Sequence, residues 1–101
     1  PLRGTIDPAG DADVFFFDSE RGRMVTITVR AKTLTPPSPA VLKLELFLGT
    51  VKLGESVGSE TRDPTFTFAT LPLFGRYFVR LTETHNRGGP TFTYEITLTI
   101  Q

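Results

Sequence analysis

Four aspartates lie close together near the start of the chain and could hold a metal ion. Asp7, Asp11, Asp13 and Asp18 fall within 12 residues. Hard carboxylate oxygens on a turn are the ligands that Ca²⁺ prefers, although the spacing differs from that of an EF-hand loop. Asp7, Asp11 and Asp13 are therefore candidate metal ligands, and calcium is the candidate cofactor. The alternative is that these carboxylates accept hydrogen bonds from N–H groups of the turn, as Asp commonly does.

The other residues that could do chemistry do not form a catalytic pattern. The single His, His85, lies in a polar loop, and no Ser stands in a Gly-x-Ser-x-Gly sequence. Glu45 and Glu95 fall on the outward faces of predicted strands, where we expect solvated acids and not a pair that converges in a cleft. We therefore predict that the protein is not an enzyme.

Three phenylalanines are expected on the surface, and they are the main indication of binding. In residues 76–82, Tyr77, Val79 and Leu81 share one face of the predicted strand. If that face is buried, Phe78 points outward, because successive side chains of a strand point to opposite faces. The same rule turns Phe16 and Phe47 outward. An exposed apolar patch marks a partner or ligand site, and Arg beside aromatic residues is typical of interface anchors. The candidate binding residues are Phe16, Phe47, Phe78, Arg76 and Arg80.

Two further considerations bear on whether these phenylalanines form a binding site and on what would bind there. Loops, or the proline-rich segment 36–39, could cover the phenylalanines and leave no site. Carbohydrate-binding surfaces favour Trp and Tyr, so three phenylalanines favour contact with a protein over contact with a sugar.

The elements that must position these residues are short β-strands. Strand-forming Thr, Val, Ile, Phe and Tyr dominate the sequence, and Gly and Pro interrupt them at short intervals. Segment 54–64 is polar and reads as a loop, whereas the proline-rich stretch 34–40 reads as a rigid crossing between two layers. We predict an all-β, antiparallel two-sheet β-sandwich, jelly-roll-like, with about eight strands. The predicted strands are 2–6, 14–18, 23–30, 41–48, 51–53, 65–69, 76–82 and 91–101.

Length and charge exclude several classes of protein. A chain of 101 residues builds one domain, and its 11 basic and 11 acidic residues lack the positive excess of a nucleic-acid binder. No apolar run approaches the roughly 20 residues of a membrane span, so we expect no membrane partner. Because the sequence opens at Pro1, without Met, we expect residues 1–101 to be a single domain excised from a longer secreted protein.

The order of several motifs resembles the bacterial pre-peptidase C-terminal (PPC) domain family, and more distantly the collagen-binding domains of collagenases. The two best matches are Gly-Asp-x-Asp followed by alternating aromatics at 10–17, and Leu-Pro-x-x-Gly-x-Tyr-x-Val-x-Leu at 71–81. The resemblance extends over nearly the whole chain. It implies a jelly-roll-like sandwich appended to exported enzymes or surface proteins, without catalytic activity of its own. The related collagen-binding domains bind their substrate and calcium.

Together these observations predict a non-catalytic accessory module of a secreted or surface bacterial protein. We expect it to bind a protein or an extracellular polymer, and a neighbouring catalytic domain of the same chain is one candidate. The alternative is a structural spacer or assembly domain with no separate ligand. We expect a monomer that is secreted, periplasmic or on the cell surface.

Overall fold

The computed structural model describes residues 2–101, which form eight β-strands and no helix. None of these residues belongs to a helix that could cross a membrane. The all-β prediction is confirmed. The strands are β1 (Leu2–Thr5), β2 (Ala12–Ser19), β3 (Val25–Arg30), β4 (Leu42–Leu48), β5 (Val51–Val57), β6 (Thr65–Phe68), β7 (Gly75–Glu83) and β8 (Thr93–Ile100).

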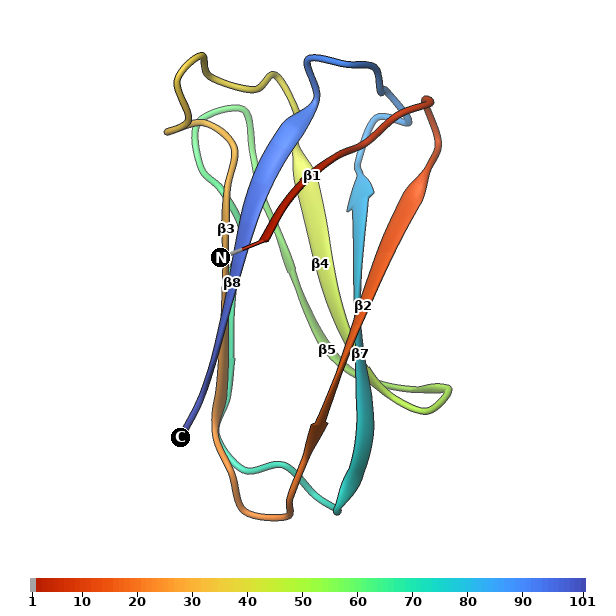
Figure 1. The fold of residues 1–101 in the computed structure, drawn as a ribbon, viewed down its shortest axis with the longest axis vertical. Helices are drawn as coiled ribbons and strands as arrows, with labels where there is room; N and C mark the ends of the chain where they lie inside the picture. The colour runs from red at the N-terminus through yellow and green to blue at the C-terminus, as the bar shows by residue number, and fades with distance from the viewer. Residues whose placement is uncertain (1) are drawn as a thin grey trace.

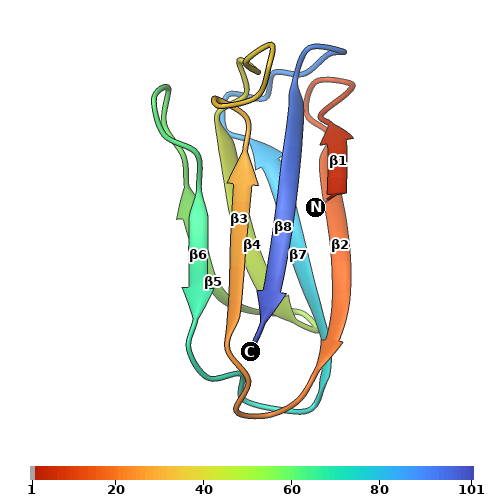
Figure 2. The ribbon, with the colours of Figure 1, turned by 60° about the vertical axis from the view of Figure 1, so that its left-hand side comes forward.

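The strands form two antiparallel sheets that pack face to face (Figures 1 and 2). One sheet has the order β1-β8-β3-β6 and is called the β8 sheet below; the other, the β7 sheet, has the order β2-β7-β4-β5. This is the strand order of an eight-stranded jelly roll, which confirms the predicted sandwich. The proline-rich stretch 34–40 carries the chain from β3 in one sheet to β4 in the other, as the sequence indicated.

The core lies between the sheets and follows the alternation of each strand. In β3, Val25, Ile27 and Val29 are buried, because side chains two residues apart share a face. Tyr94 of β8 is 2% exposed, and Gly4 of the neighbouring strand lies against its ring. A Cβ at Gly4 would overlap the phenol, so this position requires a residue without a side chain.

One predicted loop is wrong in its first part. Strand β5 continues to Val57, whereas the sequence indicated that residues 54–64 form a loop. Glu55 lies opposite Glu45 and Val57 opposite Lys43, so the segment is held by pairing with β4. Its side chains are mostly polar because β5 is an edge strand, and hydrophobic alternation therefore could not reveal it.

Candidate functional site

The outer face of the β7 sheet brings the three predicted phenylalanines into one row. Phe16 of β2 lies opposite Phe78 of β7, and Phe78 lies opposite Phe47 of β4. We call these three residues the aromatic row. Phe16 is 61% exposed, and the other two rings are partly exposed. Residues that are distant in the sequence are therefore neighbours in register across three strands.

Arg76 lies at one side of the aromatic row and is held in place by two contacts. Its guanidinium donates to both carboxylate oxygens of Asp18, from Nε at 3.0 Å and from Nη2 at 3.3 Å. The same guanidinium stacks 4.2 Å from the centroid of the Phe16 ring. The hydrogen bonds from Arg76 lower the pKa of Asp18, so this carboxylate stays charged. Sequence analysis had not assigned Asp18 to the binding surface, because the β2–β7 register decides its partner.

Arg80 lies at the other side of the row, beside a buried acid. Its Nη1 is 3.5 Å from Oε1 of Glu45, and Nζ of Lys52 is 3.1 Å from Oε2 of the same residue. Glu45 is 6% exposed, so the expectation that it is a solvated acid is wrong. Its charge is compensated by cations from both neighbouring strands. Hydrogen bonds to Glu55, and secondarily to Glu45, raise the pKa of Lys52.

The core side of the β7 sheet supports the row. Phe17 stacks on Tyr77 with ring centroids 5.4 Å apart and planes 14° apart. The Tyr77 hydroxyl donates to the carbonyl of Leu73 at 2.6 Å, which satisfies the only polar atom of this buried side chain. The row is therefore carried by well-packed strands and not by mobile loops.

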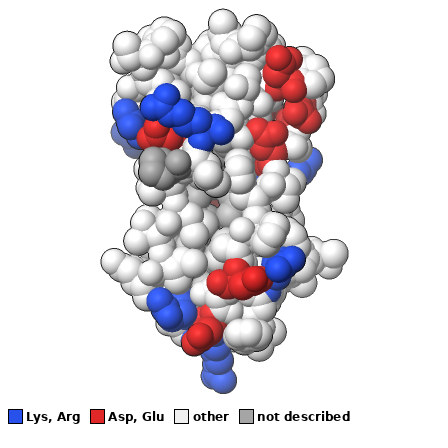
Figure 3. Space-filling view, in the orientation of Figure 1, with Lys and Arg blue, Asp and Glu red and all other residues white. Residues whose placement is uncertain are grey.

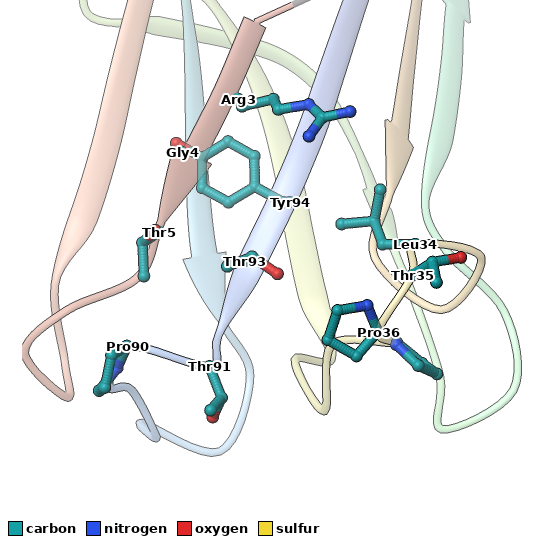
Figure 4. Close-up of a pocket in the computed structure, with 11 residues that line it drawn as sticks. Arg3, Gly4, Thr5, Leu34, Thr35, Pro36, Pro90, Thr91, Thr93 and Tyr94 are labelled. Atoms are coloured by element: carbon teal, nitrogen blue, oxygen red, sulfur yellow. The ribbon is translucent and has the colours of Figure 1, made fainter.

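The proline-rich crossing lies away from the aromatic row. It therefore does not cover the three phenylalanines, which was one of the alternatives that the sequence left open. Residues 34–37 instead line a hollow of about 550 Å³ with β1 and the start of β8 (Figure 4). Arg3 and Tyr94 are the only ionisable residues in its lining, and threonine and proline side chains make up most of the rest. This hollow contains no pair of groups suited to acid–base catalysis.

The aspartates predicted as metal ligands, Asp7, Asp11 and Asp13, lie in and beside the β1–β2 turn. Within residues 2–101, no three acidic or His side chains converge closely enough to hold an ion. Asp13 instead accepts a hydrogen bond from the Tyr94 hydroxyl, while the N–H of Asp11 donates to the carbonyl of Pro8 at 3.2 Å. Burial, followed by this contact with Asp13, raises the pKa of Tyr94. The hydrogen bond from the Tyr94 hydroxyl to Asp13 favours the alternative in which the turn residues serve local hydrogen bonding.

Glu83, the last residue of β7, is a buried carboxylate that was not predicted from the sequence. Its carboxylate accepts hydrogen bonds from the Arg87 side chain at 2.8 Å and from the N–H groups of Val41, His85 and Arg87. Glu83 thus ties the start of β4 to the β7–β8 loop. His85 is exposed in that loop, and its Nδ1 is 3.8 Å from Oε2 of Glu83.

Comparison with known proteins identifies the fold. No family model matches the sequence, and no curated protein matches it. The periplasmic inhibitor of g-type lysozyme PliG from Aeromonas hydrophila superposes with a TM-score of 0.73 at 17% identity, covering 99% of this chain and 83% of that one. The pre-peptidase C-terminal domain of Bacillus anthracis collagenase superposes with a TM-score of 0.71 at 15% identity, covering 97% and 86%.

A third structure with this fold is a carbohydrate-binding module, CBM36, in complex with calcium and xylotriose. Its TM-score is 0.50 at 13% identity, over 100% of this chain and 87% of that one. At these identities the likeness establishes the fold alone. The resemblance to the PPC domain that the sequence motifs indicated is therefore confirmed in three dimensions, and this chain has the jelly-roll β-sandwich fold of that domain.

Proposed function

We propose that this domain is a non-catalytic accessory module that binds a protein through the outer face of the β7 sheet. The observation that supports the proposal is the aromatic row, in which Phe16, Phe78 and Phe47 lie side by side with Phe16 61% exposed. Arg76 and Arg80 flank the row, and rigid aromatic and arginine side chains are the residues that contribute most energy to protein interfaces. The fold is also that of a lysozyme inhibitor, which binds another protein.

The proposed place of action is outside the cytoplasm: secreted, periplasmic or on the cell surface. This agrees with the periplasmic description of the Aeromonas inhibitor and with the collagenase that carries a domain of this fold. The candidate partners are an extracellular protein or polymer, including another domain of the same polypeptide.

Binding experiments with purified proteins test the proposal. A g-type lysozyme and soluble collagen serve as protein probes, and xylotriose serves as the carbohydrate probe. We expect Phe16→Ser and Phe78→Ser to weaken binding of a protein probe by about tenfold or more, as loss of an interface anchor does. Phe74→Ser is the matched control, because Phe74 is 80% exposed but lies in the β6–β7 loop outside the row.

Two results would contradict the proposal. One is a domain that binds xylotriose and neither protein. The other is a protein probe that binds the row variants as tightly as it binds the unmodified chain.

The structural spacer is the second candidate, and the oligomeric state distinguishes it. A spacer separated from its partner should self-associate through the apolar row, whereas a binding module should remain monomeric. Analytical ultracentrifugation of the unmodified chain and of Phe16→Ser makes this comparison: self-association that Phe16→Ser abolishes, without binding to either protein probe, would favour the spacer.

A further inference from the structure

The two long sides of the sandwich differ in how they are closed. On one side β5 and β6 meet, where the N–H of Thr65 donates to Ser56 Oγ at 3.2 Å. On the other side β2 is paired with neither β1 nor β8, and an apolar cavity of about 280 Å³ lies between these strands. The cavity is lined by Leu2, Phe15, Phe16, Phe17, Val79, Ile96, Thr97 and Leu98. It is therefore a gap at the edge of the core.

Buried and stacked side chains hold the walls of this cavity in place. Val79 is fully buried, and Phe17 stacks on Tyr77. Phe15 meets the Tyr94 ring edge to face, with centroids 6.3 Å apart and planes 84° apart. Phe15 and Phe17 pack against the core, yet both remain only half-buried. The cavity is thus preformed, and its phenylalanines still have apolar surface to bury.

The lining provides apolar contacts and almost no polar ones. Of the lining residues that the structure describes, only Thr97 has a polar side chain, and none is charged. Figure 3 shows a hollow near the middle of the molecule, with charged side chains gathered above and below it. Ligand sites of this kind are mostly apolar and contain few polar groups. We therefore expect an uncharged, apolar occupant.

The charges around the cavity favour an occupant of neither sign. The charged residues on the flanking strands have partners within the protein: Arg3 with Glu95, Asp18 with Arg76, Arg80 with Glu45, and Asp13 with the Tyr94 hydroxyl. Beyond the ends of β2 lie two acids and two bases that make no ion pair within residues 2–101, namely Asp11, Glu20, Arg21 and Arg23. Their charges balance, so size and hydrophobicity must select the occupant.

We infer that this cavity is the anchor pocket of the proposed interface and takes one aromatic side chain, of phenylalanine or tryptophan size, from the partner protein. The inference rests on the proposed function and names the group that the partner inserts. Phe16 belongs both to the aromatic row and to the lining, so the row and the cavity are continuous at β2. An apolar cavity of about 150 Å³ accepts benzene, so about 280 Å³ has room for a phenyl or an indole group. Anchors that fill such pockets contribute much of the energy of an interface.

Uncharged model compounds test the pocket without a partner. The probes are the N-acetyl amides of tryptophan, phenylalanine and serine, and the readout is the NMR shift of the Val79, Ile96 and Leu98 methyl groups. We expect the two aromatic amides to shift these signals with a Kd of about 1 mM, as weak fragments do. The serine amide should not shift them. The methyl groups of Val51, which is 62% exposed on β5, report non-specific contact and should not respond.

Matched variants at Leu98 separate the pocket from the aromatic row. Leu98→Phe fills the cavity, whereas Leu98→Met keeps the volume of the side chain. We expect Leu98→Phe to abolish binding of the amides and to weaken binding of the lysozyme or collagen probe about tenfold. Leu98→Met should bind like the unmodified chain. Phe78→Ser alters the row outside the lining and should change binding of the amides less than about threefold.

Three results would overturn the inference. They are no shift of the three methyl signals by either aromatic amide at about 10 mM, equal shifts at Val51, or a folded Leu98→Phe variant that binds the amides or the protein probe as tightly as the unmodified chain. If Leu98→Phe does not fold, the methyl shifts of the unmodified chain decide.

The same measurements distinguish failure of the anchor from failure of the proposed function. Protein binding that Phe78→Ser weakens and Leu98→Phe leaves unchanged would refute the anchor and leave the proposed function intact. If neither protein probe binds but the aromatic amides do, the proposed function fails while the aromatic pocket stands.

Discussion

Replacement of Glu83 by Gln tests whether its buried charge stabilises the fold. The Glu83 side chain is 1% exposed, and its carboxylate accepts four hydrogen bonds from the chain around it. Gln keeps the size of the side chain but loses the charge. Its NH₂ group replaces one carboxylate oxygen, so it faces hydrogen-bond donors and cannot accept from them. The variant therefore removes the attraction to Arg87 and leaves N–H groups without an acceptor.

The magnitude follows from the pKa of the carboxyl. Burial by itself raises the pKa of Glu83, but hydrogen bonds from the Arg87 side chain and from three N–H groups outweigh it and lower the pKa from 4.5 to about 2. A difference of about 2.5 units corresponds to about 3 kcal/mol in the free energy of unfolding. The folded pKa lies below the unfolded value, so this stabilisation is complete above about pH 5. It is lost as the pH falls through about 2.

Urea unfolding of the unmodified chain and of Glu83→Gln between pH 7 and pH 2 measures this effect. We expect the variant to be less stable by about 3 kcal/mol at pH 7, and we expect the difference to shrink toward pH 2. Glu20→Gln is the control, because Glu20 is exposed after the end of β2 and makes no ion pair with any of residues 2–101. A difference below about 1 kcal/mol at pH 7, or one that stays constant down to pH 2, would refute the reasoning.

Three further changes have defined outcomes. Gly4→Ala should lower the free energy of unfolding by about 2 kcal/mol, because the added Cβ displaces the Tyr94 ring; an unchanged urea midpoint would contradict the close packing. Asp18→Asn should release Arg76 from its fixed position, seen as faster exchange of the Arg76 Nε–H by NMR; an unaltered signal would mean that the ring contact alone holds the guanidinium. Calcium at about 1 mM should leave the midpoint of thermal unfolding unchanged, since within residues 2–101 no three acidic or His side chains are grouped to hold an ion. A rise in the midpoint that Asp11→Ala abolishes would restore the calcium prediction.

Alternation along the sequence was sufficient to predict the fold class and the direction of most side chains. The period of two in β3 and β7 placed Val25 and Tyr77 in the core and turned Phe78 outward. These are local properties, because backbone geometry alone sends neighbouring side chains of a strand to opposite faces. The same rule predicted the outward direction of Phe16 and Phe47 without knowledge of their neighbours.

The prediction failed where a side chain depends on a distant partner. Glu95 was expected to be solvated, yet it is 8% exposed between Arg3 Nε at 3.2 Å and Arg30 Nη1 at 3.1 Å. Glu45 is enclosed in the same way by Arg80 and Lys52. Long cationic side chains from adjacent strands cover these carboxylates. The residues next to Glu45 and Glu95 in the sequence do not indicate this burial, because it depends on strands that are distant in the chain.

The sequence by itself determined that this chain forms short strands, that they pack as a sandwich, and that three phenylalanines point outward. Only the tertiary structure decided that β2, β7 and β4 are neighbours in a register that places Phe16, Phe78 and Phe47 in one row. It also decided that β2 is an edge strand, and that Asp13 accepts a hydrogen bond from the Tyr94 hydroxyl. The physical reason is that strand direction and side-chain parity are set by each residue's own backbone. Register and edge position arise from pairing between segments far apart in the chain.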